Sequence, residues 1–128
     1  MRNTRAFLTD VRNACTTLHE FTDGKGFSDY TGSAMMRSAV ERQFEIIGDA
    51  LNQAMKLDPS IEEKITSARR AVDFRNRLSH AYWGISHEVV WGVIENHLPI
   101  LNEEITALID GEDKPPLKPY VSPKARHA

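Results

Sequence analysis

The sequence predicts an all-α protein, an antiparallel bundle of four to five helices. Apolar residues recur every three or four positions along most of the chain, which is the spacing of one helix face. No segment shows the alternation of apolar and polar residues that is typical of a half-buried strand. The interruptions between helical segments are short, as expected where neighbouring helices run in opposite directions.

The first two long helices are predicted by their apolar faces. Phe7, Val11, Ala14, Leu18 and Phe21 line one side of a first helix of about five turns. Asp23-Gly24-Lys25-Gly26 then breaks the pattern, and a loop is expected to residue 31 or so. A longer helix is expected over residues 33–56, with an apolar face formed by Met36, Val40, Phe44, Ile47, Leu51 and Ala54.

The second half of the chain contains clear helix boundaries. Asp58-Pro59 predicts a helix start, with Asp58 as the N-cap and Pro59 in the first turn, and a break is expected near Ser67. Gly84 is expected to end this element. Ser86 is expected to cap a last helix, which Pro99 should kink.

Two regions are expected along the chain. Residues 1–110 should form the bundle as one domain. Residues 111–128 contain four prolines and few large apolar groups, so a flexible Pro-rich tail is expected there.

Composition limits the possible partners and the compartment. The chain has 16 basic and 18 acidic residues, a net charge of -2, so nucleic acid could be bound only through a local patch. Cys15 is the single cysteine, which fits a reducing compartment. The N-terminus lacks a signal-peptide pattern and no long apolar span occurs, so a cytoplasmic protein without membrane contact is expected.

The most informative segment of the chain is Asp73-Phe74-Arg75-Asn76-Arg77-Leu78-Ser79-His80-Ala81-Tyr82-Trp83-Gly84. It brings a guanidinium, an imidazole and a phenol into one short stretch. His80 can act as base or acid near neutral pH, and Arg75 can hold phosphate oxygens and stabilise developing charge.

These groups suit the cleavage of RNA without a metal or cofactor. The 2′-hydroxyl beside each phosphodiester is a built-in nucleophile, and its attack would leave a 2′,3′-cyclic phosphate. DNA lacks this hydroxyl and is not expected as a substrate. A single His80 cannot easily serve as both acid and base, whereas a symmetric dimer would bring two to one cleft.

Helix geometry leaves the arrangement of this segment open. On an ideal helix Arg75 and His80 diverge by about 140°, so convergence requires a helix that ends near His80 or a second copy of the chain. Asn76 lies one turn before His80 and could orient its imidazole or stabilise the local backbone. Arg77 belongs to a basic cluster with Arg69, Arg70 and Arg75, which is either a solvated face or part of the site.

Two other patterns carry less weight. Glu45 and Asp49 share a helix face and could orient Arg75 or His80, but a solvated or dimer-edge acidic pair is favoured. The histidines show no H-E-x-x-H motif or other ligand spacing, so no metal site is expected.

The segment Arg75-Asn76-Arg77-Leu78-Ser79-His80-Ala81-Tyr82 resembles the R-x4-H-x-Y signature of HEPN-domain proteins, specifically the HepT-like toxins. Similar flanking stretches occur in the expected order over about residues 4 to 110. They are Thr4-Arg5-Ala6-Phe7-Leu8-Thr9-Asp10, Phe44-Glu45-Ile46-Ile47-Gly48-Asp49-Ala50, Trp83-Gly84-Ile85 with Val90-Trp91, and Asn96-His97-Leu98-Pro99.

This resemblance implies a HEPN fold, a homodimer whose two signature segments line one cleft, and a type VII toxin–antitoxin system. It implies a metal-independent endoribonuclease that acts on tRNA or mRNA, with Arg75 and His80 catalytic and Asn76, Arg77 and Tyr82 lining the site. It also implies an MntA-like minimal nucleotidyltransferase antitoxin that transfers AMP to Tyr82. The alternative is a non-catalytic HEPN subunit that binds a nucleotide or the nucleotidyltransferase, and a purely structural bundle is a third reading.

Overall fold

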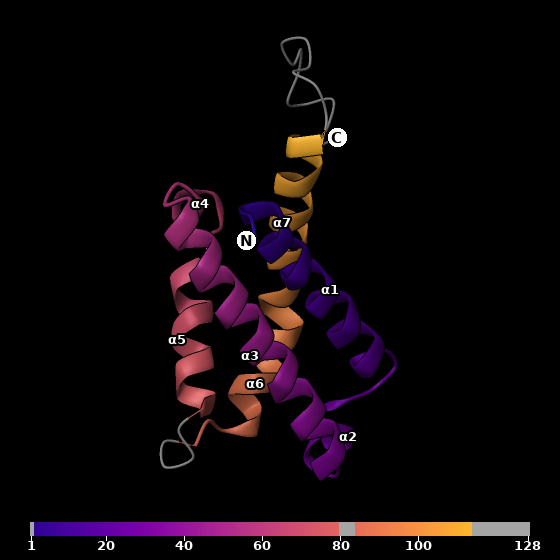
Figure 1. The fold of residues 1–128 in the computed structure, drawn as a ribbon. Coiled ribbons are helices and arrows are strands. Elements are labelled where there is room, and N and C mark those ends of the chain that lie inside the picture. The colour runs from indigo at the N-terminus through magenta and orange to yellow at the C-terminus, as the bar shows by residue number, and fades with distance from the viewer. Residues whose placement is uncertain (1, 80–83, 114–128) are drawn as a thin grey trace.

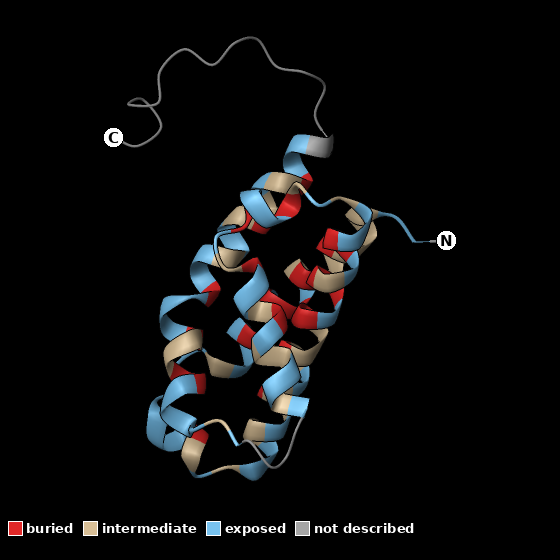
Figure 2. Ribbon diagram, turned by 90° about the vertical axis from the view of Figure 1, so that its left-hand side faces the viewer, coloured by how far each residue is buried: buried red, intermediate tan, exposed pale blue. Residues whose placement is uncertain are grey.

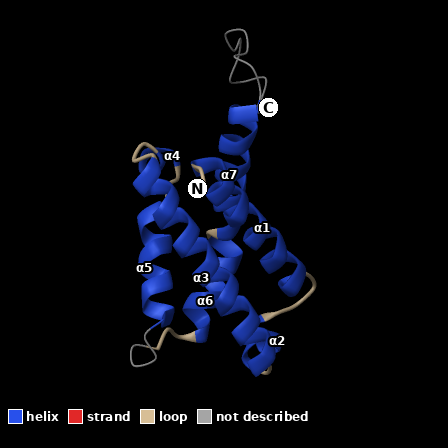
Figure 3. Cartoon of the chain, in the orientation of Figure 1, coloured by secondary structure: helices blue, strands red, loops and turns tan. Residues whose placement is uncertain are grey.

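The computed structural model describes residues 2–79 and 84–113, and this part of the chain consists of helices and loops without strands (Figure 3). The all-α prediction is therefore confirmed. In chain order the described helices are α1 Thr4–Thr22, α2 Phe27–Thr31, α3 Ala34–Leu57, α4 Ile61–Lys64, α5 Ala68–Ser79, α6 His87–Asn96 and α7 Leu98–Asp113. None of them is long and apolar enough to cross a bilayer.

The long helices form an antiparallel bundle around α3 (Figure 1). α1 and α5 lie on opposite sides of α3, and both run against its direction. The run of α6 and α7 then returns alongside α1. Four long elements thus alternate in direction, as the sequence predicted, and the two additional helices, α2 and α4, are short.

The core lies where the inner faces of these helices meet (Figure 2). α3 contributes buried residues from Val40 to Met55 because it packs against neighbours on two sides. Among the described residues the buried set contains no polar or charged side chain. Most of the predicted apolar positions are buried or half-buried, but Phe21 is 38% exposed and does not belong to the core.

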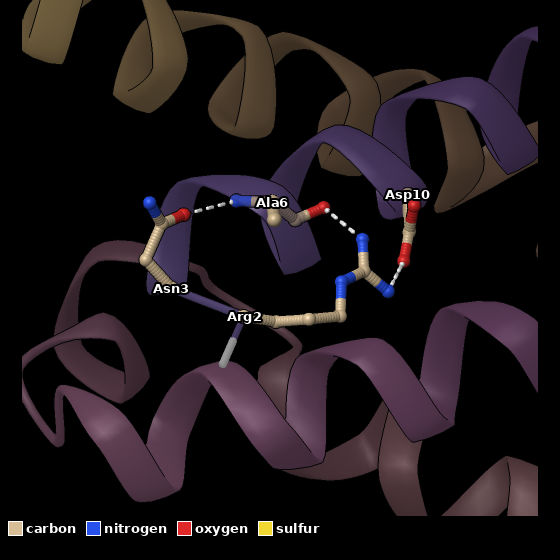
Figure 4. Close-up of polar contacts among 4 residues, drawn as sticks. All are labelled: Arg2, Asn3, Ala6 and Asp10. Carbon is tan, nitrogen blue, oxygen red and sulfur yellow. Dashed lines mark hydrogen bonds and ion pairs between the residues drawn. The ribbon is translucent and has the colours of Figure 1, made fainter.

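The first turn of α1 is fixed by two neighbouring polar side chains (Figure 4). The side chain of Asn3 accepts a hydrogen bond from the backbone N–H of Ala6 at 2.8 Å, which caps the helix. Arg2 donates to the Ala6 carbonyl at 3.2 Å and pairs with Asp10 at 2.6 Å.

The expected loop before α3 contains a short helix instead. In α2 the side chain of Asp29 accepts a hydrogen bond from the backbone N–H of Gly26 at 2.8 Å. Tyr30 is 1% exposed and packs against the rings of His87 and Trp91, with centroids 5.7 and 5.6 Å away. Tertiary burial of this aromatic side chain holds a helix that the glycine-rich sequence did not predict.

The predicted helix start at Asp58 is also wrong by a few residues. Asp58 follows the last turn of α3, and α4 begins only at Ile61. The Asp58 carboxylate accepts hydrogen bonds from the backbone N–H and the hydroxyl of Ser60, at 3.1 and 2.7 Å, which forms a turn. These hydrogen bonds lower the pKa of Asp58.

The break expected near Ser67 is confirmed and is tied to α7. Residues 65–67 separate α4 from α5. The backbone N–H and the hydroxyl of Thr66 donate to the carboxylate of Glu104, with the hydroxyl at 2.6 Å. This contact fixes the point from which α5 starts.

The last helical run begins as predicted but divides at Pro99. Ser86 caps α6 by accepting a hydrogen bond from the N–H of Val89 at 3.2 Å. Pro99 does not kink one helix. It occupies the first turn of a new helix, α7, where a missing N–H costs nothing. α7 includes residues 111–113 of the expected tail, and residues 114–128 lie outside the described part.

Candidate functional site

Arg75 lies where α5 comes into its closest contact with α3. A methyl group at Gly48 of α3 would lie 2.2 Å from Cβ and 2.8 Å from Cγ of Arg75, and 3.1 Å from the carbonyl oxygen of Ala71. Any side chain at Gly48 would therefore force the two helices apart. The absence of a side chain at this one position sets how deeply the Arg75 stem sits between the helices.

The Arg75 guanidinium is paired with Asp49, the residue after that glycine. The Nε atom of Arg75 lies 2.7 Å from a carboxylate oxygen of Asp49. Nε is shielded from solvent but forms no hydrogen bond of acceptable angle, so the contact is an ion pair with imperfect alignment. The side chains are 34% and 54% exposed, and such pairs add only about 0–1 kcal/mol to stability. The pair therefore matters mainly for the orientation of Arg75.

A second contact holds the same guanidinium from the other end. Nη1 of Arg75 donates to the side-chain oxygen of Asn76 at 3.3 Å. Asn76 therefore contacts Arg75, whereas its predicted contact with His80 lies outside the described residues.

The other predicted site residues are placed only in part. Arg77 is exposed and, two residues after Arg75, projects from nearly the opposite side of α5. α5 is described as far as Ser79, whose hydroxyl donates to the carbonyl of Arg75 at 3.1 Å. His80 and Tyr82 lie outside the described residues, so their positions relative to Arg75 stay predictions.

The four arginines of the basic cluster predicted from the sequence differ in their partners. Arg69 pairs with Glu62 at 2.6 Å, and Arg75 pairs with Asp49. The side chains of Arg70 and Arg77 have no hydrogen-bond or ion-pair partner among residues 2–79 and 84–113. The cluster is therefore not one continuous solvated face.

One feature of this site was given too little weight from the sequence and another was missed. Asp49 is 54% exposed, as expected for a solvated residue, but its carboxylate also contacts Arg75, which was the less favoured role. Gly48 was not singled out. The sequence feature that could have identified it is a glycine inside a long predicted helix. Glycine there costs about 1 kcal/mol of stability relative to alanine, so its presence indicates that another part of the chain packs closely against the helix.

Possible metal ligands do not gather in this part of the protein. Across residues 2–79 and 84–113, no group of three or more His, Cys, Asp or Glu side chains is arranged to hold an ion. Cys15 is buried in the core, and this burial raises the pKa of its thiol to about 12.

Comparison with known proteins gives the family. The family model described as "Ribonuclease HepT-like" matches residues 11–108 of the chain. This match covers well over half of the sequence, including α3, α5 and the segment that follows α5. The chain belongs to the HepT-like ribonuclease family.

Individual relatives agree with this assignment over nearly their full lengths. A protein of Thermococcus cleftensis named "Probable ribonuclease HepT" is 30% identical over 111 residues, which cover 84% of this chain and 96% of the relative. A protein of Methanocaldococcus jannaschii, named as a candidate RNase, is 29% identical over 106 residues, covering 81% of this chain and 94% of the relative. No solved structure gives a significant match.

The contact at Gly48 predicts the effect of a single methyl group. Gly48→Ala should destabilise the protein by about 2 kcal/mol, since overpacking against a backbone-anchored group exceeds the gain in helix propensity. The control is Gly92→Ala in α6, where an added methyl group has no neighbour within 4 Å, so stability should rise by about 0.5–1 kcal/mol. Urea unfolding measures both. Equal stabilisation by the two substitutions would show that α3 and α5 are not in close contact at Gly48.

Proposed function

We propose that this member of the HepT-like family is the toxin of a type VII toxin–antitoxin system, a metal-independent endoribonuclease. The observation that carries this proposal is the restrained guanidinium of Arg75, which contacts Asp49 through Nε and Asn76 through Nη1 and whose side chain is 34% exposed. Arg75 is also the first residue of the R-x4-H-x-Y motif. A guanidinium fixed in advance is suited to the charge that develops on a phosphodiester during cleavage.

In the proposed reaction His80 takes the proton from the 2′-hydroxyl of the substrate. The 2′-oxygen attacks the adjacent phosphorus, and the bond from phosphorus to the 5′-oxygen of the next nucleotide breaks. Arg75 stabilises the negative charge on the non-bridging oxygens. The leaving 5′-oxygen receives a proton, so the products are a 2′,3′-cyclic phosphate and a 5′-hydroxyl.

A homodimer supplies the second proton carrier. One imidazole that has just accepted a proton from the 2′-hydroxyl is poorly placed to protonate the leaving oxygen on the opposite side of the phosphorus. A second chain, related by a twofold axis, contributes a second His80 to the same cleft. Arg75 from both chains then contacts the phosphate, and tRNA or mRNA is the substrate.

The partner in this proposal is an MntA-like minimal nucleotidyltransferase that acts as the antitoxin. It transfers AMP from ATP to the phenol oxygen of Tyr82, two residues after His80: the phenol oxygen loses its proton and bonds to the α-phosphorus, and pyrophosphate leaves. The added phosphate carries negative charge next to Arg75, and the nucleoside adds bulk. Both effects exclude the RNA backbone from the cleft.

Cleavage can be tested in cells and with the purified protein. Expression should arrest bacterial growth, and His80→Ala or Arg75→Ala should relieve the arrest, since each removes a group that acts at the phosphate. Purified wild-type protein should cut RNA in the presence of a chelator and leave 2′,3′-cyclic phosphate ends, at least about 100-fold faster than His80→Ala.

The control is Arg12→Gln on α1, which should cut RNA at the wild-type rate. If the unmodified dimer leaves RNA intact and its expression is harmless, the chain is a non-catalytic subunit that binds a nucleotide or the nucleotidyltransferase.

The modification of Tyr82 has its own test. Co-expression with the proposed MntA-like nucleotidyltransferase should add the mass of AMP to the peptide that contains Tyr82, as measured by mass spectrometry, and growth should recover. Tyr82→Phe should stay unmodified and toxic despite the antitoxin. Neutralisation of Tyr82→Phe to the wild-type extent would contradict this mode of control.

A further inference from the structure

One side of the bundle is only partly closed. α5 packs closely on α3, but it makes little or no contact with α6 and α7. An apolar pocket of about 160 Å³, open to solvent, lies between them. Its main lining residues are Phe44 and Ile47 of α3, Ala71 and Phe74 of α5, Val93 of α6 and Leu101 of α7. Apolar side chains that a fourth helix would normally cover are therefore accessible here.

The apolar surface continues beyond the pocket onto α6. Val89 lies four residues before Val93, on the same side of the helix, and is 47% exposed. On α5, the half-buried Leu78 follows Phe74 by one turn. The pocket is therefore the middle of a wider apolar strip that runs across α5 and α6.

Charges of opposite sign stand at the two edges of this strip. Arg70 and Arg77 lie seven residues apart on the outer side of α5, and Glu88 and Glu95 lie seven residues apart on the outer side of α6. Both separations are two helical turns, about 10.5 Å. All four side chains are exposed, and none has a hydrogen-bond or ion-pair partner among residues 2–79 and 84–113. Asp73 lies between the two arginines but about 40° farther from the pocket than Arg77.

This surface is called the α5–α6 face below. It is basic along α5, apolar in the middle and acidic along α6, and it comprises Arg70, Phe74, Arg77, Glu88, Val89, Val93 and Glu95. A surface that carries both charges on opposite edges is complementary to a second copy of itself, which is the requirement for an interface with twofold symmetry.

The heights of these charges determine how two copies can meet. Because α5 and α6 run in opposite directions, Arg77 and Glu88 lie at one end of the face and Arg70 and Glu95 at the other (Figure 1). A twofold axis parallel to the helices brings the basic edge of each copy onto the acidic edge of the other, with Arg77 opposite Glu88. An axis across the helices would bring the two basic edges together. The charge pattern therefore selects the parallel axis.

We propose that the α5–α6 face is the homodimer interface of this protein, with the twofold axis parallel to α5 and α6. This inference rests on the proposed ribonuclease function, which needs a second chain, and it names the surface through which that chain binds. The parallel axis keeps the carboxyl ends of both α5 helices at the same end of the dimer, so the segments that follow Arg75 in the two chains can line one cleft. An axis across the helices would place them at opposite ends. Apolar burial supplies the affinity, and the charges fix the orientation.

Exchange of the charges tests the interface in the full-length protein by sedimentation equilibrium. Wild type should be a dimer. Arg70→Glu with Arg77→Glu makes both edges acidic and should raise the dissociation constant of the dimer about 100-fold, because four attractive pairs become repulsive. Glu88→Arg with Glu95→Arg should have the same effect. The quadruple exchange should restore the dimer to within about tenfold of wild type, and an equal mixture of the two double variants should form mixed dimers.

The apolar strip has a separate test. Val89→Asp should raise the dissociation constant about 100-fold, because the dimer would bury an unpaired charge. The control is Met35→Asp, which changes another exposed apolar residue. Met35 lies nine residues before Phe44 and so on the opposite side of α3, and its variant should dimerise like wild type. Since both side chains are exposed in the single chain, both variants should retain wild-type helix content in circular dichroism.

Two results would overturn this interface. One is a wild-type monomer, which would leave the α5–α6 face to a different protein partner. The other is a dimer that both charge reversals and Val89→Asp leave intact. If such a dimer cuts RNA, the interface is wrong and the proposed function stands. If the substitutions dissociate a wild-type dimer that never cuts RNA, the interface stands and the ribonuclease function is refuted.

Discussion

The close approach of α3 and α5 at Gly48 is the constraint on which the candidate site depends. It places the stem of Arg75 directly on the α3 backbone and brings Asp49 within reach of the guanidinium. It also sets the width of the apolar pocket beside these helices, because Phe44 and Ile47 of α3 and Ala71 and Phe74 of α5 line this pocket. A shift of α5 would therefore change the position of Arg75 and the shape of the pocket together.

Asp49 affects Arg75 in two opposing ways. A carboxylate 2.7 Å from the guanidinium reduces its attraction for a phosphate, yet it also limits the rotamers that a long side chain can adopt. Orientation is the larger effect when the group acts on a transition state, because small displacements of a catalytic group cost much more than weak screened charges at a half-exposed site. Under the proposed function, the arrangement would give up some affinity for RNA in order to fix the direction of the guanidinium.

Local patterns in the sequence predicted much of the fold. The periodic faces located α1 and α3, and Ser86 was identified as a cap because its effect depends only on the next turn. The errors at α2, Asp58 and Pro99 have two sources. Tyr30 is held by contacts with α6 that are distant in sequence, whereas Asp58 and Pro99 each permit two local structures that sequence alone does not separate.

The site was predicted less completely than the fold. The motif located Arg75, and the sequence offered Asp49 only as a less favoured partner. Asp49 is 26 residues away, so the contact was established only when α3 and α5 were placed side by side. The residues that line the apolar pocket beside α5 come from four helices, so no short sequence motif contains them. His80 and Tyr82 lie outside the described residues, and their roles stay predictions from the motif.

The most direct test of this account is the rate of RNA cleavage by Asp49→Asn, Arg75→Ala and the double variant. If Asp49 acts by orienting Arg75, Asp49→Asn should lower kcat about tenfold without raising KM. The double variant should then be no slower than Arg75→Ala. If Asp49→Asn leaves kcat unchanged, or if the two substitutions lower kcat independently, then Asp49 does not position the guanidinium and the central claim is wrong.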